Sequence, residues 1–233
     1  MNRSPSNATP ARVAIVDYGM GNLFSVQRAC AHVGLVAEIT SNPAEVEAAD
    51  AVILPGVGAF GDAMAELTRL GLAQALRQAA TRGKPLMGIC LGMQLLMTES
   101  HEFGRHQGLQ LLEGDVVRFE ASPSGAREVK VPHIGWNRVH HAPGVSWDGS
   151  PLAGLSDGEP MYFVHSFYVR PTHLADVLAI SRYGEREFCA SLRRGNLFAC
   201  QFHPERSGPQ GLRIYRQFAA AMAPIVHEEA RHD

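Results

Sequence analysis

Short apolar segments alternate with amphipathic stretches through the amino-terminal half of the chain, and this alternation limits the possible folds more than any other feature. The apolar segments predict strands at residues 12–18, 37–40, 51–54 and 85–90. The stretches between and after them have the apolar spacing of helices, at residues 22–33, 62–82 with a break near Gly71, and 91–99. Strands and helices that alternate in this way form a parallel sheet with helices on both faces.

The carboxy-terminal half has a different rhythm, in which shorter strands are separated by turns. We expect these strands at residues 115–119, 137–140, 161–168, 177–183 and 190–192, before a buried strand at 197–202 and a closing helix at 212–222. The predicted fold class is therefore α/β: an open, mostly parallel sheet flanked by helices, with an antiparallel-rich insertion. No repeat or linker divides the chain, so we expect a single domain over residues 12–224, a polar leader at 1–11 and a polar tail at 225–233.

Composition excludes several classes of protein. The 233 residues carry a formal net charge of −2 at pH 7 and no basic stripe, which argues against a nucleic-acid partner. No apolar run approaches the roughly 20 residues that span a bilayer, and the polar start of the chain lacks the apolar core of a signal peptide. None of the four cysteines lies in a CxxC pair or a zinc-ligand pattern; they are Cys30, Cys90, Cys189 and Cys200. We therefore expect a cytoplasmic protein with reduced thiols and no metal.

The segment 88–92, Gly-Ile-Cys-Leu-Gly, lies where a predicted buried strand meets a predicted helix. It has the form of a nucleophile elbow, in which a sharp turn exposes the central side chain at the carboxyl end of the strand. Flanking glycines leave room for the turn, and the helix start supplies N–H groups and a dipole that favour a thiolate. The N–H of Leu91 is placed to stabilise an oxyanion. Cys90 is thus a candidate nucleophile; the alternative is a small buried cysteine that packs like alanine, which we favour for the other three.

A candidate base follows the last predicted strand, in the segment 201–205, Gln-Phe-His-Pro-Glu. In an extended segment, residues two apart point to the same side, so His203 and Glu205 can converge. A cysteine nucleophile needs a base within hydrogen-bonding reach, and a carboxylate fixes the tautomer of that base. A His-x-Glu sequence alone is more often a solvated turn. Here, however, Cys90 and His203 both end apolar strands of one predicted parallel sheet, whose carboxyl ends are where sites form.

Three segments together resemble the signatures of class I (triad-type) glutamine amidotransferases. In chain order, as in the family, they are 56–58 (Gly-Val-Gly), 88–94 (Gly-Ile-Cys-Leu-Gly-Met-Gln) and 202–205 (Phe-His-Pro-Glu). The resemblance implies a flavodoxin-like α/β fold and a catalytic triad of Cys90, His203 and Glu205.

The same resemblance implies the groups that surround the substrate. Segment 56–58 is similar to the family's oxyanion strand, so Val57 or Gly58 would supply a second N–H donor beside Leu91. The residues that match positions contacting the substrate glutamine are Gln94, Ser166 and Phe167. The alternatives are that Gln94 is a solvated helix residue and that the other two are ordinary strand residues.

Further segments, at 17–23, 55–61, 132–137 and 162–168, resemble the glutaminase subunits of imidazole glycerol phosphate synthases. The similarity extends from about Val13 to about Ala221. It implies hydrolysis of L-glutamine to L-glutamate and ammonia, with no cofactor and no metal. The ammonia would pass to a separate (β/α)8-barrel cyclase subunit in a heterodimer, which forms imidazole glycerol phosphate and an aminoimidazole carboxamide ribotide in histidine biosynthesis. Trp136 and Tyr162 are either contacts to that subunit or core aromatics, and Arg206 is either such a contact or a surface charge.

Three other functions fit these residues less well. Another class I glutaminase, serving anthranilate, pyridoxal phosphate, GMP or CTP synthesis, is disfavoured by the segment Pro-His-Ile-Gly-Trp-Asn at 132–137. A catalytically silent regulatory subunit of the same fold is disfavoured by the intact triad. A cysteine hydrolase acting on peptides gives no reason for Gln94 or for the strand at 56–58.

Overall fold

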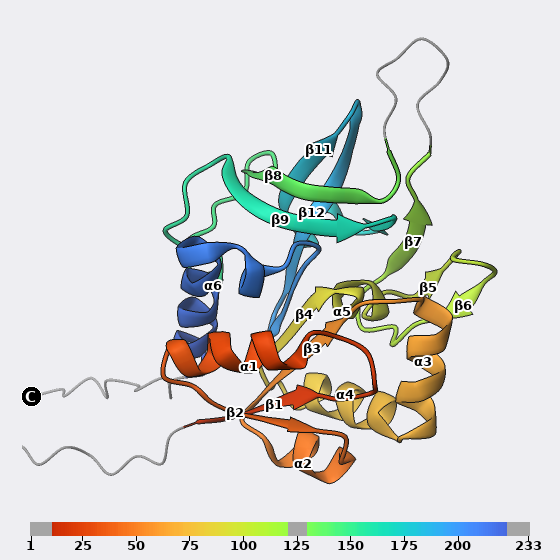
Figure 1. Ribbon diagram of the computed structural model, residues 1–233, viewed down its shortest axis with the longest axis vertical. Coiled ribbons are helices and arrows are strands. Elements are labelled where there is room, and N and C mark those ends of the chain that lie inside the picture. The colour runs from red at the N-terminus through yellow and green to blue at the C-terminus, as the bar shows by residue number, and fades with distance from the viewer. Residues whose placement is uncertain (1–10, 121–129, 223–233) are drawn as a thin grey trace, which may run out of the picture.

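The computed structural model describes residues 11–120 and 130–222. Five parallel strands form one half of its central sheet (Figure 1). They lie in the order β2 (Val36–Thr40), β1 (Arg12–Val16), β3 (Ala51–Gly56), β4 (Leu86–Cys90) and β13 (Leu197–Cys200). β3 and β4 are buried along their whole length, as expected for parallel strands with helices on both faces. The expected leader, except for Ala11, and the expected tail lie outside the described residues.

Four antiparallel strands continue this sheet beyond β13. They are β12 (Arg186–Arg194), β11 (Val177–Tyr183), β8 (His133–His141) and β9 (Glu159–His165). A second sheet has the order β10 (Phe167–Pro171), β7 (Gly114–Arg118), β5 (Glu99–Ser100) and β6 (His106–Gln107). The α/β fold class is confirmed. The antiparallel part is more than an insertion, because within the described residues it provides half of the strand pairings of the central sheet.

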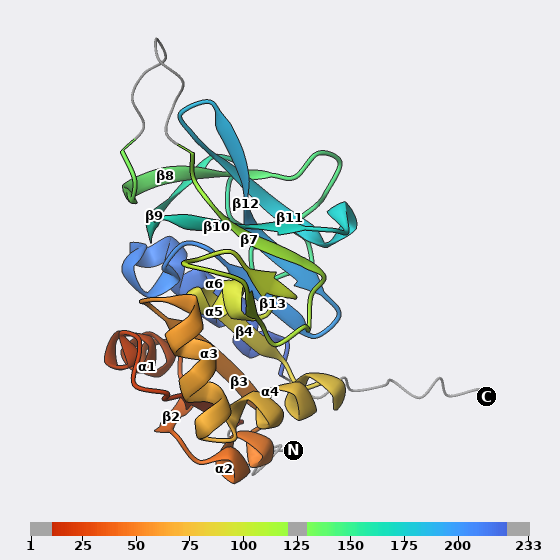
Figure 2. The ribbon, with the colours of Figure 1, turned by 90° about the vertical axis from the view of Figure 1, so that its right-hand side faces the viewer.

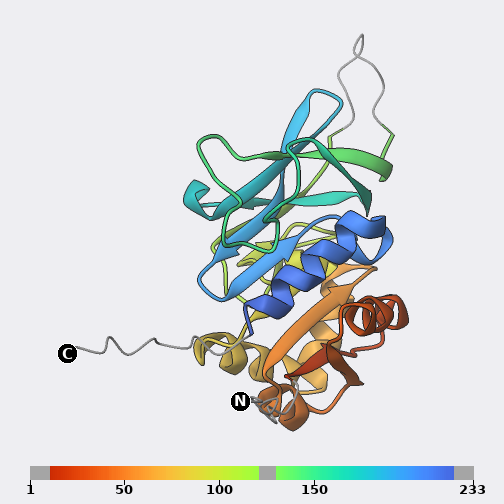
Figure 3. The same cartoon turned by 90° about the vertical axis from the view of Figure 1, so that its left-hand side faces the viewer.

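Helices cover the two faces of the parallel half. The long helices α1 (Leu23–His32) and α6 (Gly208–Ala220) lie on one face (Figure 3), and α2 (Pro43–Ala48), α3 (Phe60–Arg69) and α4 (Leu72–Thr81) lie on the other (Figure 2). Strand β1 shows the division, because Val13 and Ile15 pack with α1 and α6, whereas Ala14 and Val16 pack with α3 and α4. The hydrophobic core is therefore two layers separated by the sheet.

Several predicted elements are confirmed and others are wrong. The strand at 177–183 has the predicted bounds, and the helical stretch 62–82 is broken at Gly71, whose φ of +75° suits glycine. Helix α2 was not predicted, although Asn42 caps it and Pro43 begins it. A helix of six residues spans fewer than two turns and gives little periodicity to detect.

Strand β3 does not stop at Leu54 as predicted but continues through Pro55 and Gly56. β1 pairs with β3 only as far as Ile53, whereas β4 pairs with it up to Gly56. Pro55 thus has a neighbouring strand on one side alone, which is where a residue without an N–H is tolerated.

The predicted helix at 91–99 is also too long, since α5 spans only Leu91–Leu95. Beyond it the backbone pairs with β7, where Thr98 N–H donates to Gly114 O at 3.1 Å and His101 N–H to Val116 O at 3.0 Å. The predicted strand at 161–168 is in fact two strands, β9 and β10, which belong to different sheets and meet at Ser166. No helix among the described residues is long and apolar enough to span a membrane.

Candidate active site

Cys90 ends β4 at the carboxyl edge of the sheet, and α5 begins at the next residue. Its backbone has a φ of 56° and a ψ of −110°, a conformation that residues with a Cβ rarely adopt. Such strain costs of the order of 1–3 kcal/mol and is concentrated at functional sites. The sharp strand-to-helix turn expected from the segment 88–92 is therefore present in the structure.

Glycine at position 92 lets α5 lie directly on β3. A Cβ atom on Gly92 would overlap the carbonyl oxygen of Leu54, and one on Gly88 would lie 3.0 Å from the carbonyl carbon of Gly92. Backbone atoms cannot move aside as the end of a flexible side chain can. The two glycines of the elbow are thus required by packing.

His203 follows β13 at the same edge of the sheet, because β13 and β4 are parallel neighbours. Its Nδ1 lies 2.8 Å from Oε1 of Glu205, and the two side chains are 5% and 1% exposed. The segment is not extended as predicted, since Glu205 lies in the 3-10 helix η2 (Pro204–Arg206). The turn still brings the carboxylate to the ring. Because a carboxylate accepts, Nδ1 carries the proton and Nε2 is left as the basic nitrogen.

The surroundings of His203 favour its charged form. Burial lowers the pKa of the ring, but the neighbouring Cys90 sulfur and the Glu205 carboxylate outweigh it and raise the pKa to about 10. The Nε2 atom of His203 is buried and has no hydrogen-bond partner of ordinary length and angle among residues 11–120 and 130–222. It is therefore free to exchange a proton with the neighbouring sulfur of Cys90. An imidazolium beside a thiolate is the resting state of many cysteine nucleophiles.

Tyr18 holds the strand that faces the elbow. Its buried hydroxyl donates to the carbonyl oxygen of Pro55 at 2.8 Å. A Cβ atom on Gly56 would overlap this hydroxyl oxygen. The next residues, Val57 and Gly58, turn away from the sheet, and Gly58 has a φ of +113°.

A pocket of about 230 Å³ opens above Cys90. Its lining consists of Val57, Gly58, Cys90, Leu91, Gln94, Glu102, Pro132, Val164, His165, Ser166 and Phe167. The predicted oxyanion and substrate residues thus lie together around the thiol, whereas His203 and Glu205 are not part of the lining. Two larger hollows, of about 410 and 480 Å³, contain none of the predicted site residues.

Gln94 lines the pocket but is buried, so it is not a solvated helix residue. Its Nε2 donates to Phe167 O at 3.0 Å and to Oε1 of Gln201 at 3.1 Å. Both of its N–H bonds are therefore used, and its Oε1 is the atom left to accept from a ligand. The side-chain role of Gln201 was not predicted, although it begins the segment that carries the base.

Two buried histidines support the pocket wall and were likewise not predicted as site residues. His165 Nδ1 lies 2.8 Å from Phe167 O, which can only accept, so its Nε2 accepts from Nδ1 of His133 at 2.9 Å. Burial lowers the pKa of His165 to about 3 and that of His133 to about 4. Both rings are therefore neutral at pH 7 and act as hydrogen-bonding struts.

Glu102 is the acidic residue of the pocket lining. It is buried, and one carboxylate oxygen accepts from the N–H of Phe60 at 2.7 Å, at the start of α3. No sequence pattern marks this residue, because it is positioned by contact with a distant helix. Within the part of the chain that the structure describes, no cluster of three or more histidine, cysteine or acidic side chains is arranged to hold a metal ion.

The fold and this site define a class of protein. The model of the family "Glutamine amidotransferase class-I" matches residues 14–222, and the chain belongs to that family. Within it, the chain is similar to proteins named imidazole glycerol phosphate synthase subunit HisH. The relative from Moorella thermoacetica is 50% identical over 206 residues, covering 88% of this chain and 93% of its own. The relative from Rhodopirellula baltica is 49% identical over 214 residues, covering 92% of this chain and 100% of its own.

Solved structures of lower identity share the fold. The structure of PurLQS from Thermotoga maritima superposes with a TM-score of 0.69 at 22% identity, covering 92% of this chain and 100% of the other. A crystal structure of a glutamine amidotransferase gives a TM-score of 0.65 at 21% identity, covering 89% of this chain and 98% of the other. At these identities the likeness concerns the architecture alone.

Proposed function

We propose that this chain is the glutaminase subunit of an imidazole glycerol phosphate synthase, which hydrolyses L-glutamine and passes the ammonia to a cyclase subunit. The observation that carries the proposal is the meeting of a strained cysteine, a carboxylate-bound histidine and a small polar pocket at one sheet edge. The names of relatives about half identical to this chain support the choice among class I glutaminases. Their names favour this assignment over anthranilate, pyridoxal phosphate, GMP or CTP synthesis. We also propose one domain over residues 12–224 and a cytoplasmic location.

In the proposed mechanism, the Cys90 thiolate attacks the side-chain carbonyl carbon of glutamine. The carbonyl electrons move to oxygen, and the resulting tetrahedral intermediate collapses as the C–N bond breaks. His203 gives its Nε2 proton to the departing nitrogen, so ammonia leaves and a thioester remains. Water, deprotonated by the now neutral His203, attacks the thioester; the C–S bond breaks, glutamate leaves, and the Cys90 thiolate and His203 imidazolium are restored. Glu205 holds the ring in place throughout and stabilises His203 whenever it is the imidazolium.

The oxyanion of both tetrahedral intermediates needs inward-pointing N–H donors. Leu91 offers one at the start of α5, and Val57 or Gly58 is the source of the second across the pocket. A missing donor of this kind slows catalysis by roughly 10²–10³. Because Gly58 tolerates backbone angles that other residues avoid, its peptide can reorient at little cost. We therefore propose that the free chain hydrolyses glutamine slowly until the partner completes the oxyanion hole.

The pocket also offers groups for the amino-acid end of glutamine. Glu102 places a buried negative charge at the lining, where it can pair with the α-ammonium of the substrate. Gln94 presents its free Oε1, and main-chain groups at Ser166 and Phe167 bound the opposite side. This set recognises a small zwitterion with a terminal amide.

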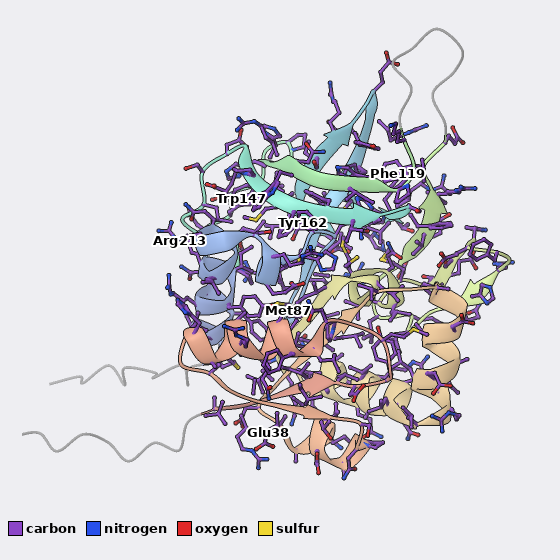
Figure 4. The ribbon with its side chains drawn as sticks, viewed as in Figure 1. Glu38, Met87, Phe119, Trp147, Tyr162 and Arg213 are labelled. Atoms are coloured by element: carbon purple, nitrogen blue, oxygen red, sulfur yellow. The ribbon has the colours of Figure 1, made fainter. Side chains whose placement is uncertain are left out.

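A surface for the partner lies beside the pocket. Ile134 and Trp136, two residues apart on β8, are 60% and 59% exposed, and Val57 on the pocket rim is 43% exposed. Trp136 packs edge-on against Tyr162, whose position on β9 is labelled in Figure 4, and the Arg206 guanidinium lies 4.3 Å from the same ring. Exposed apolar and aromatic side chains around a site mark an interface. A docked partner would also shield ammonia from bulk water, in which it is mostly protonated and unreactive.

The decisive experiment is the substitution Cys90→Ala, tested in the complex with the cyclase. We expect glutamine-dependent synthesis to disappear, while synthesis from ammonium salt at raised pH persists, because the cyclase chemistry lies on the other subunit. Glutaminase turnover of the wild-type chain alone, with cyclase, and with cyclase plus its ribotide ligand measures the gating. Substantial glutamine hydrolysis by the alanine variant would refute the nucleophile, and full speed of the free chain would refute the gating only.

A further inference from the structure

The Cys90 sulfur has a second polar neighbour besides its base. Gln201 follows β13 directly, and its Nε2 lies 3.6 Å from the Sγ of Cys90, within hydrogen-bonding distance for sulfur. The Gln201 side chain is fully buried, and its backbone N–H is anchored to Ala190 O at 2.9 Å. Because β13 and β4 are parallel neighbours, the residue after each strand ends at the same edge. The pairing of these two strands therefore places the Gln201 amide beside the Cys90 sulfur.

The orientation of the Gln201 amide follows from the carbonyl group of Phe167, through Gln94. The carbonyl oxygen of Phe167 can only accept, so the atom of Gln94 that contacts it at 3.0 Å is Nε2. The second N–H of that nitrogen faces Gln201 at 3.1 Å, so the Gln201 atom there is the acceptor, Oε1. The remaining end of Gln201, its NH2 group, must then face Cys90. The hydrogen bonds therefore all point the same way: Gln94 donates to Gln201, and Gln201 donates to the sulfur of Cys90.

We propose that Gln201 is a further catalytic residue, which donates a hydrogen bond to the Cys90 sulfur and thereby stabilises and aims the thiolate. This rests on the proposed function, since it takes Cys90 as the nucleophile. An N–H donor stabilises an anion more than a neutral thiol, so its loss disfavours the charged form. The sulfur thus has two polar neighbours from different strands, the Gln201 amide beyond β13 and the Val164 carbonyl oxygen of β9, which lies 3.7 Å from it.

Other groups act on the same sulfur and must be kept constant in a test. The groups whose pKa is affected by Cys90 are His203, three residues after β13, Tyr18, two residues after β1, and Cys200, the last residue of β13. Glu102 lies across the pocket. Gln201 is uncharged, so its replacement by a neutral residue removes the donor and leaves these charges as they are.

The proposal is tested with Gln201→Met, which keeps the length of the side chain and removes the donor, and with Gln201→Glu. As a carboxylate, the glutamate still accepts from Gln94 but places negative charge beside the sulfur. The measurement is the rate of Cys90 alkylation by iodoacetamide as a function of pH, followed by mass spectrometry. Cys30, Cys189 and Cys200 are buried, and a Cys90→Ala control defines their background.

We expect the midpoint of the pH profile to rise by about one pH unit in Gln201→Met, a tenfold loss of thiolate below the midpoint, and by more in Gln201→Glu. In the complex with the cyclase, kcat for glutamine hydrolysis should fall about tenfold or more in both variants. KM should change little in Gln201→Glu, because the contact to Gln94 is kept. The matched control is Gln27→Met, which removes a glutamine donor to Ala37 O far from the site and should leave the profile unchanged.

Alkylation does not depend on glutamine hydrolysis, so this test and that of the proposed function can fail separately. A folded Gln201→Met protein with the wild-type midpoint and the wild-type kcat would overturn the role of Gln201. If Gln201→Met does not fold, the test rests on Gln201→Glu. An unchanged midpoint of its alkylation profile would then also overturn the role of Gln201. Glutamine hydrolysis that survives Cys90→Ala would instead remove the proposed function.

Discussion

The contact between Tyr18 and Gly56 makes a quantitative prediction about the strand beside the nucleophile. Tyr18→Phe removes the hydrogen bond to Pro55 O and leaves that buried carbonyl unpaired, which should cost about 1–3 kcal/mol of stability. Gly56→Ala introduces a methyl group that overlaps the Tyr18 hydroxyl, and overpacking of this kind costs about 1–3 kcal/mol.

The double variant should lose less stability than the sum of the losses in the two single variants. Once the hydroxyl is gone, the nearest atoms to the new Cβ are Cβ and Cγ of Leu91, at 3.0 and 3.3 Å. Each of the two substitutions thus removes part of the harm done by the other. We expect the double variant Tyr18→Phe/Gly56→Ala to be no less stable than Gly56→Ala alone, which is a coupling of about 1 kcal/mol or more.

Urea unfolding of the four proteins, followed by far-ultraviolet circular dichroism, measures this coupling. Similar m-values across the set would show that the denatured states are comparable. Single-variant losses that add to within about 0.5 kcal/mol in the double variant would refute the steric explanation of Gly56.

Three further predictions concern the site. Glu205→Gln should lower turnover less than His203→Ala, because the carboxylate orients the base while the histidine moves the proton; equal, total loss in two folded variants would contradict this. Glu102→Gln should raise KM for glutamine about tenfold or more with a smaller effect on kcat, and an unchanged KM would exclude the contact to the α-ammonium. The folded-state pKa of His165 lies below its unfolded value, so its stabilisation is present above about pH 6.5 and is lost on acidification. Unfolding measured in urea from pH 7 to pH 4 should show a loss of about 3 kcal/mol from this residue, and a flatter slope in His165→Gln.

The parallel half of the fold could be predicted because its signals are local. Buried strands such as the one ending at Cys90 are continuous apolar runs, and the break at Gly71 is set by a single glycine. The errors arose where a contact with another strand decides the structure. Pro55 stays in its strand because β1 has already ended beside it, and the helix after the elbow stops because β7 offers partners to its backbone.

The residues of the site also fall into those that local sequence could predict and those that a distant contact positions. The residues predicted to line the pocket belong to short segments whose local form is already suggestive, such as the elbow around Cys90. Glu102 is positioned by the start of α3, and Gln201 by the pairing of β13 with β4, so neither could be assigned a role from its neighbours in sequence. His203 and Glu205 were predicted to converge through an extended backbone, and they converge through a turn instead.

Strand β13 lies in the interior of the central sheet, between β4 and β12, although it is the last strand that the structure describes. Ribosomes deliver a chain from its amino terminus, so β4 and β12 both leave the tunnel before the strand that separates them. Until β13 inserts, both of these strands expose an unpaired edge, and Cys90 has neither His203 nor Gln201 beside it. A nascent chain therefore contains Cys90 before the histidine that activates it has been synthesised. A polypeptide released before β13 would carry the nucleophile but lack its base and could not catalyse the reaction.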